Sequence, residues 1–143
     1  QSEQLDVVKI TKLALEIFNE KHIRFESSDA EIFAIFDRTQ LIRVVTNLVK
    51  NALQACKELS QPIIKVFVQK QENQIVIEVT DNGVGIEEKN SDKIFEPKFT
   101  TKTSGMGLGL AMVKNILQAY NGSITFNSIP NKKTTFRVVF SSK

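Results

Sequence analysis

The sequence predicts an α+β fold, a two-layer α/β sandwich in which a mixed, mostly antiparallel sheet is covered on one face by about three helices. Three observations indicate this class. Apolar residues recur with the 3.6-residue period of a helix in three segments, and strand-like segments with a period near two lie between them. Short turn-rich segments join strands into hairpins. The repeated strand–helix–strand order of a parallel, doubly wound domain is absent.

Two of the predicted helices have recognisable boundaries. Asp37 precedes the strongest helix and stands three residues before Gln40, which is the arrangement of a capping box. Gly122 follows the last helix at the C′ position, where glycine commonly ends helices. The predicted helices are Leu5–Glu20, Arg38–Lys57 and Gly107–Asn121.

The predicted strands are short and mostly joined by turns. Lys70–Asn73 and Pro130–Lys133 are expected to be hairpin loops. Val84–Ser104 has little periodicity and is long for a loop in a compact domain, which is typical of a functional lid or a disordered loop. The predicted strands are His22–Glu26, Glu31–Phe36, Ile63–Gln69, Ile75–Asp81, Ser123–Ser128 and Thr134–Phe140.

The composition fits one soluble globular domain. The chain has 143 residues, 41% hydrophobic and 24% charged, which argues against intrinsic disorder. No apolar run approaches the roughly 18 residues of a membrane span. The single cysteine, Cys56, excludes an internal disulfide and a cysteine-only metal cluster. A net charge of +3 permits anionic ligands but does not indicate nucleic acid, so no nucleic-acid partner is expected.

The first candidate site residues lie on the predicted helix Arg38–Lys57. At about 100° per residue, Asn51 falls at the edge of the apolar arc of this helix, and Asn47 lies one turn away on the same flank. A carboxamide at the boundary of a core needs partners, because an unsatisfied buried amide costs about 1–3 kcal/mol. Asn51 is therefore either an ordinary surface asparagine or a neutral oxygen ligand for a hard cation such as Mg²⁺.

Asp81 ends the predicted strand Ile75–Asp81. The period of two places its carboxylate on the same face as Ile77, where a charge is costly unless it accepts strong hydrogen bonds. It could accept one from the exocyclic amine of a base, with Gly83 and Gly85 letting backbone approach the ring. The alternative is a simple Asp-Asn-Gly turn, which the second glycine and the long following loop disfavour.

Three glycines, Gly105, Gly107 and Gly109, surround the start of the last predicted helix. Glycines there expose amide N–H groups at the positive end of the helix dipole, which suits phosphate. A flexible hinge is the alternative interpretation. Two other phosphate motifs are excluded: Leu110 occupies the third glycine position of Gly-x-Gly-x-x-Gly, and Gly-x4-Gly-Lys-Ser/Thr does not occur.

Together these segments resemble the boxes of the catalytic, ATP-binding domain of histidine kinases, in the superfamily shared with gyrase, heat-shock chaperone ATPases and mismatch-repair ATPases. Residues 47–52 resemble the N box, 81–86 the first glycine box, 94–102 the F box and 105–110 the second glycine box. The resemblance covers nearly the whole chain. The F box is most similar to that of nitrogen-regulation sensor kinases, although Lys98 stands where an aromatic residue is common.

The resemblance implies a role for each matched residue and makes ATP and Mg²⁺ the expected cofactors. Asn51 would coordinate a Mg²⁺ ion that bridges the phosphates, supported by Asn47. Asp81 would bind the adenine amino group, with Gly83 and Gly85 shaping the base pocket. An ATP lid is expected between the two glycine boxes. The remaining residues expected to bind the nucleotide or anchor the lid are Phe95, Phe99, Thr101, Lys102, Gly105, Gly107, Leu108 and Gly109.

The residue at position 47 discriminates among members of this superfamily. Members that hydrolyse ATP or phosphorylate serine typically carry Glu four residues before the Mg²⁺ asparagine, whereas this chain has Asn47, which is not a general base. A histidine acceptor needs less help, because a neutral imidazole is a competent nucleophile near its pKa of about 6.5. The expected function is γ-phosphoryl transfer from Mg-ATP to a histidine in two-component signal transduction. The alternative is an ATP-binding regulatory module without phosphotransfer.

The acceptor histidine is expected to lie outside this chain. His22 is the single histidine, and its surroundings do not resemble the phosphoacceptor motif of the family. Residues 1–143 are therefore expected to form one ATP-binding domain of a longer sensor kinase, whose own dimerisation domain and a downstream response regulator are its partners. The domain is expected to be monomeric, cytoplasmic and without membrane contact, in a homodimeric, membrane-anchored bacterial kinase.

Overall fold

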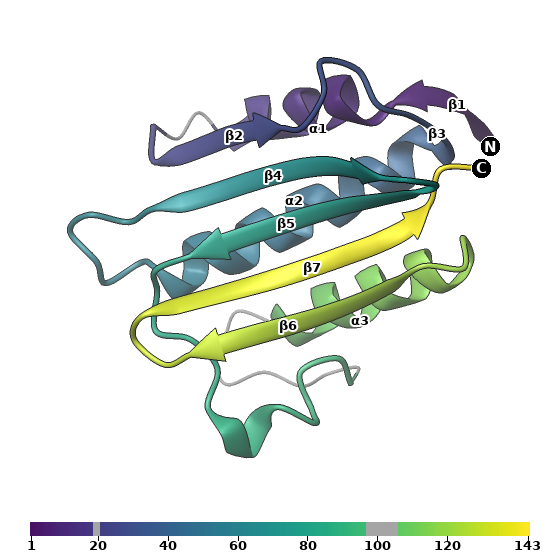
Figure 1. The fold of residues 1–143 in the computed structure, drawn as a ribbon. Coiled ribbons are helices and arrows are strands. Elements are labelled where there is room, and N and C mark those ends of the chain that lie inside the picture. Colours follow the sequence, from purple (N-terminus) through teal and green to yellow (C-terminus); the bar gives the residue numbers. More distant parts are fainter. Residues whose placement is uncertain (19–20, 97–105) are drawn as a thin grey trace.

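The computed structural model describes residues 1–18, 21–96 and 106–143. Figure 1 shows a layer of strands with helices behind it. None of the helices in these ranges is long and apolar enough to cross a membrane. In chain order the elements are β1 (Ser2–Asp6), α1 (Val7–Leu15), the 3₁₀ helix η1 (Glu16–Phe18), β2 (Ile23–Ser27), β3 (Phe33–Asp37), α2 (Arg38–Ala55), β4 (Ile64–Gln71), β5 (Gln74–Asp81), the 3₁₀ helix η2 (Glu88–Asn90), α3 (Met106–Gln118), β6 (Ser123–Ile129) and β7 (Lys133–Ser141).

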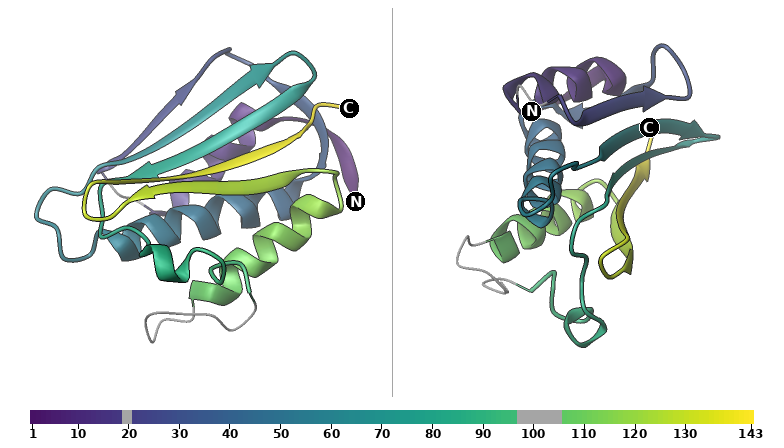
Figure 2. Two further views of the ribbon diagram at one scale, coloured as in Figure 1. Left: turned by 60° about the horizontal axis from the view of Figure 1, so that its bottom comes forward. Right: turned by 90° about the vertical axis from the view of Figure 1, so that its left-hand side faces the viewer.

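Five strands form the main sheet in the order β2-β4-β5-β7-β6. β2 pairs with β4 in parallel, and the other neighbouring strands pair antiparallel. The helices α1, α2 and α3 lie on the same side of this sheet (Figure 2). The predicted fold class, a mixed and mostly antiparallel sheet covered by helices on one face, is confirmed.

The core lies between the sheet and the three helices. One face of β5 enters it, because Ile75, Ile77 and Val79 are at most 1% exposed. Each fully buried side chain of this size contributes about 1.5–3 kcal/mol relative to an exposed one, so α2 is firmly held against the sheet. The residues of α2 that are buried are Leu41, Val44, Val45, Thr46, Leu48, Val49 and Ala52.

The first predicted helix, Leu5–Glu20, was wrong at its start. Ser2–Asp6 forms β1, which pairs antiparallel with β3 in a separate two-stranded sheet. Asp6 then caps α1, since its Oδ1 atom accepts hydrogen bonds of 3.0 Å from the N–H groups of Val8 and Ile32. The apolar residue Leu5 fits a helical face as well as a buried strand position, so periodicity alone did not separate the two structures.

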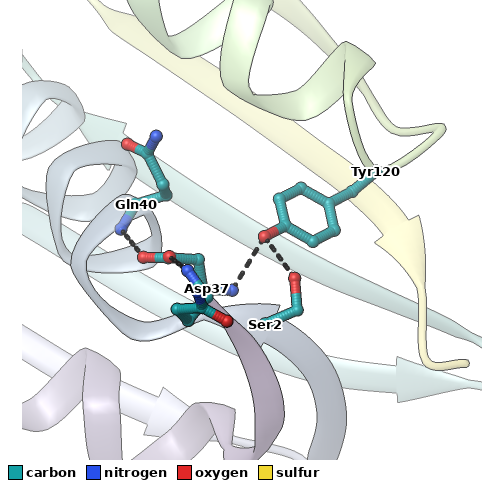
Figure 3. Close-up of polar contacts among 5 residues, drawn as sticks. Ser2, Asp37, Gln40 and Tyr120 are labelled. Atoms are coloured by element: carbon teal, nitrogen blue, oxygen red, sulfur yellow. Dashed lines mark hydrogen bonds and ion pairs between the residues drawn. The ribbon is translucent and has the colours of Figure 1, made fainter.

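The predicted cap of α2 is confirmed in one of its two halves. Asp37 Oδ1 accepts a hydrogen bond of 2.9 Å from Gln40 N–H. The Asp37 N–H group, which a full capping box would join to the Gln40 side chain, donates instead to the Tyr120 hydroxyl at 2.9 Å (Figure 3). The Tyr120 ring stacks on Phe36, with centroids 3.9 Å apart. The start of α2 is thereby tied to the segment just after α3.

The last predicted helix, Gly107–Asn121, is α3 with its end at Gln118, and its C′ position lies one residue earlier than predicted. Asn121, with φ of 58°, occupies the left-handed C′ position that was assigned to Gly122. Gly122 N–H donates to Leu117 C=O at 2.8 Å and Asn121 N–H to Gln118 C=O at 3.2 Å, which is the bonding of a Schellman motif. Gly122 is needed for a different reason, because a Cβ there would lie 2.6 Å from Val139 O.

The segment predicted as a lid, Val84–Ser104, is only partly described. It contains the short η2, and Ile94 near its described end is 3% exposed. Residues 97–105 lie outside the described ranges, so the predicted lid is described only up to Glu96.

Candidate functional site

Asp81 lies at the end of β5 with 3% of its surface exposed. It shares a buried face with Ile77 and Val79, as the period of two predicted. Its Oδ1 atom accepts a hydrogen bond of 2.8 Å from Gly83 N–H. The loop after β5 therefore curls back on the carboxylate and orients it.

The environment of Asp81 changes its protonation equilibrium. Burial raises the pKa of Asp81 from 3.8 to about 6, while the hydrogen bond from Gly83 N–H lowers it. Burial, and then the charge of Asp81, raise the pKa of the Cys56 thiol. At neutral pH the Asp81 carboxylate is mainly ionised and acts as a hydrogen-bond acceptor. A donor from a ligand would therefore offset part of the cost of burying this charge.

The two glycines of this loop are needed for close contacts within the protein. A Cβ on Gly83 would lie 2.4 Å from Ala55 O, at the end of α2. The same carbonyl accepts a hydrogen bond of 3.1 Å from Val84 N–H. Gly85 has φ of +81°, and a Cβ there would lie 2.9 Å from Pro130 Cα. The loop is thus packed between α2 and the β6–β7 turn.

Asn47, Asn51 and Ala55 follow one another at intervals of four along α2, so they lie along one flank of the helix. Both asparagines are half-buried. Asn47 Nδ2 donates to Arg43 C=O at 2.8 Å, and a Cβ on Gly109 would lie 2.7 Å from Asn47 Oδ1. This flank therefore contacts α3 at Asn47 and the Asp81 loop at Ala55. Asn51 lies between the two contacts.

The first turn of α3 contains Gly107, Leu108 and Gly109. The first four N–H groups of a helix have no partner within it, and they lie at the positive end of the dipole. Because Gly109 contacts α2 beside Asn47, this helix start is close to the flank that carries Asn51. An anion held there would lie beside α2.

Phe95 packs in an aromatic cluster formed with β6 and β7. Its ring lies 6.1 Å from Phe126 of β6 and 6.4 Å from Phe136 of β7, both in edge-on arrangements. Lys114 of α3 places Nζ 5.8 Å from the Phe95 ring centroid. These contacts hold the segment that follows η2 against the sheet and α3.

The structure brings Asp81, the glycines of its loop, the two asparagines and Gly109 together along the C-terminal half of α2. Four predicted site residues, Phe99, Thr101, Lys102 and Gly105, lie outside the described residues.

Sequence reasoning missed Thr134 and Ser128. Thr134 is 3% exposed and stands opposite Asp81 in the sheet, and Ser128 stands opposite Thr134. A signal was available, because Thr134 shares the buried face of β7 with Phe136 and Val138. A polar residue at the end of an apolar strand face was the same signal that singled out Asp81.

Asn82, beside Asp81, was also missed. Its Oδ1 atom accepts a hydrogen bond of 2.8 Å from Ile63 N–H, and its Nδ2 donates to Gln61 C=O at 3.2 Å. Asn82 therefore fastens the loop between α2 and β4 to the end of β5.

The side chains of the described residues limit how a Mg²⁺ ion could be held. In the described ranges, no three or more His, Cys, Asp or Glu side chains are grouped so that they could hold a metal ion. Mg²⁺ bound with a nucleotide usually takes only one or two protein oxygens, the rest coming from phosphates and water. The half-buried carboxamide of Asn51, between the helix start and the Asp81 loop, fits that limited requirement.

Residues 36–143 match the family described as histidine kinase-, DNA gyrase B- and HSP90-like ATPase. The match includes Asn47, Asn51, Asp81 and the glycines at the start of α3. The chain belongs to this family, as the four boxes predicted.

Its relatives include kinases, several of which are named as sensor histidine kinases. The chain is 31% identical over 133 residues to sporulation kinase B of Bacillus subtilis (strain 168), which covers 92% of this chain and 31% of that protein. It is 35% identical over 154 residues to sensor histidine kinase ZraS of Escherichia coli (strain K12), covering 94% and 33%. The chain thus spans about a third of the length of these relatives. The narrower likeness to nitrogen-regulation kinases stays a prediction.

The fold is also that of a solved kinase domain. The catalytic domain of histidine kinase ThkA superposes with a TM-score of 0.89 at 27% identity, over 99% of this chain and 96% of that one. A structure of ThkA in complex with the response regulator protein TrrA matches with a TM-score of 0.84 at 24% identity, over 99% of this chain and 42% of that chain. The predicted resemblance to a histidine kinase ATP-binding domain is confirmed.

Proposed function

We propose that this domain binds Mg-ATP along the C-terminal half of α2 and delivers the γ-phosphoryl group to a histidine on the dimerisation domain of the same sensor kinase. The observation that carries the proposal is the flank of α2. Asn51 lies between the contact with the start of α3, at Asn47, and the contact with the Asp81 loop, at Ala55. A ligand with a base at one end and phosphates at the other matches this order of groups.

Each end of the ligand has a matching group. Asp81 accepts a hydrogen bond from the exocyclic amine of adenine, with Oδ1 held by Gly83 N–H at 2.8 Å. The amides at the start of α3, including those of Gly107 and Gly109, bind the phosphates. Asn51 offers its carboxamide oxygen to Mg²⁺, and this ion would supply neutralisation of the triphosphate charge.

Phosphoryl transfer to histidine needs little chemistry from this domain. The incoming imidazole nitrogen forms a bond to the γ-phosphorus as the bond to the ADP oxygen breaks, so the domain contributes positioning and charge stabilisation. Asn47 is not a general base, because a carboxamide does not take up a proton near neutral pH. Its Nδ2 donates to Arg43 C=O at 2.8 Å, and its Oδ1 lies close to Gly109. It supports the contact between α2 and α3.

The partners follow from the same proposal. The complex of ThkA with a response regulator shows that assembly for a kinase of the same fold, and a dimerisation domain would supply the acceptor histidine. The domain acts as a monomer within a homodimeric, membrane-anchored kinase. Phe99, Thr101, Lys102 and Gly105 are proposed to complete the lid and the phosphate site, with Phe95 as the lid anchor.

The test supplies the missing acceptor. The chain is mixed with the dimerisation domain of the longer protein and ATP labelled at the γ-phosphate, and acid-labile phosphohistidine is measured. Asn51→Ala is expected to abolish labelling, whereas Asn115→Ala, the same change at an exposed position of α3, is expected to leave it unchanged. ATP binding without any labelling of the histidine would instead favour the regulatory module.

A further inference from the structure

The turn between β6 and β7 packs against the loop that follows Asp81. Asn131 N–H donates to Val84 C=O at 2.9 Å. A Cβ on Gly85 would lie 2.9 Å from both Pro130 Cα and Ser128 Oγ. The position of this loop therefore depends on β6 and β7 as well as on α2.

Ser128 is the polar centre of this contact. Its Oγ atom accepts a hydrogen bond of 2.9 Å from Ile86 N–H and lies 2.7 Å from Thr134 Oγ1. Either hydroxyl of the Ser128–Thr134 pair could be the donor, because each has one proton and two acceptor lone pairs. Thr134 is 3% exposed and stands opposite Asp81 in the register of β5 and β7. A run of contacts thus joins the loop after Asp81 to the strand position beside it.

We propose that Ser128 is a positioning residue of the nucleotide site, holding the 83–86 loop and the Thr134 hydroxyl in the geometry in which Asp81 binds a purine amine. The inference rests on the proposed function. Ser128 acts through other groups, because the donor that orients Asp81 Oδ1 is Gly83 N–H, at the start of that loop. Without the Ser128 hydroxyl, Ile86 N–H and Thr134 Oγ1 each lose a partner and the loop loses one of its attachments.

The test separates positioning from a structural role by changing the ligand as well as the protein. Dissociation constants are measured by calorimetry for a non-hydrolysable ATP analogue and for the same analogue with a purine that lacks the 6-amino group. The constant for the analogue without the amine, divided by the constant for the analogue with it, reports how well Asp81 binds the amine. In Ser128→Ala we expect binding of the amine-bearing analogue to weaken about fivefold and the ratio to fall by about the same factor.

Three further variants serve as controls. Ser123→Ala makes the same change at an exposed position of β6 and is expected to leave both constants unchanged. Ser128→Thr keeps the hydroxyl and is expected to restore the ratio. Ser128→Cys keeps the size of the side chain with a weaker hydrogen-bonding group. It is expected to lower the ratio by a smaller factor, and it tests the inference if Ser128→Ala does not fold.

The outcomes distinguish failure of the inference about Ser128 from failure of the proposed function. A lower melting temperature with an unchanged ratio, in the folded Ser128→Ala or Ser128→Cys variant, would mean that Ser128 is structural only and would overturn the inference alone. Failure of the folded wild-type chain to bind either analogue would overturn the proposed function together with the inference. A reduced ratio that Ser128→Thr restores would support both.

Discussion

Asn47 and Gly109 meet where α2 and α3 come into contact, so that a Cβ on Gly109 would lie 2.7 Å from Asn47 Oδ1. Asn47 has little freedom to move away, because its Nδ2 donates to Arg43 C=O at 2.8 Å. The absence of a side chain at position 109 thus sets how closely the N-terminal turn of α3 approaches the helix that carries Asn51.

Gly109→Ala is expected to lower the free energy of unfolding by about 1–2 kcal/mol, because the new methyl group displaces the Asn47 side chain. In an Asn47→Ala background the same change should be neutral or stabilising by up to about 1 kcal/mol, since alanine is the better helix former. Urea unfolding of the four proteins in this double-mutant cycle measures the coupling. Equal effects of Gly109→Ala in the two backgrounds would contradict the contact.

Asp81 is expected to make the domain more stable as the pH falls from 7 towards 4. Its pKa is about 6 in the folded chain against 3.8 as the ordinary value, so the folded state binds more protons between these pH values. At pH 7 the buried charge costs about 3 kcal/mol. Asp81→Asn should therefore raise the free energy of unfolding at pH 7.5 and flatten its change between pH 4 and 6. Urea unfolding at several pH values measures both effects, and an unchanged pH slope in Asp81→Asn would refute them.

The hydroxyl of Tyr120 is expected to stabilise the start of α2 through its part-buried hydrogen bond with Asp37 N–H. Tyr120→Phe keeps the ring stacked on Phe36 but removes the bonds to Asp37 N–H and to Ser2 Oγ, each of 2.9 Å (Figure 3). The free energy of unfolding should fall by about 1–2 kcal/mol, because the Asp37 N–H is left without its acceptor. Ser2→Ala removes only the exposed bond and should cost less than about 0.5 kcal/mol. Similar losses in the two variants would be the contrary result.

Thr11 is expected to be replaceable with a gain in stability. It is fully buried, and its Oγ1 atom has no hydrogen-bond partner among the described residues. Thr11→Val keeps the shape and removes the desolvated hydroxyl, so thermal unfolding should show a gain of about 1 kcal/mol. Thr46→Val is the matched control, because Thr46 Oγ1 donates to Arg43 C=O at 3.3 Å. Removing this hydrogen bond should not stabilise the domain. An equal gain in stability in Thr46→Val would contradict this explanation.

The fold class and the position of Asp81 were predictable because both follow from local periodicity. A carboxylate that continues the apolar face of a strand is visible in sequence, and its burial bears this out. The strand β1 was not predictable in the same way, since it depends on pairing with β3 about thirty residues away in sequence.

Side-chain partners distant in sequence also escaped prediction. Tyr120 contacts Asp37 across 83 positions, and no local pattern marks that pair. At the end of α3, the adjacent Asn121 and Gly122 are both suited to a positive φ, so the C′ position was assigned one residue too late. The role of Gly83 depends on Ala55 O, which reaches it only through the packing of α2 on the sheet.

Asp81 and the flank of α2 are proposed to bind Mg-ATP. This binding can be measured by calorimetric titration of the chain with a non-hydrolysable ATP analogue, with and without Mg²⁺ and alongside Asp81→Asn. We expect binding that Mg²⁺ strengthens and that Asp81→Asn weakens at least about tenfold, because an amide N–H₂ then opposes the adenine amine. A folded wild-type chain that does not bind, or that binds no better than a folded Asp81→Asn variant, would contradict the claim.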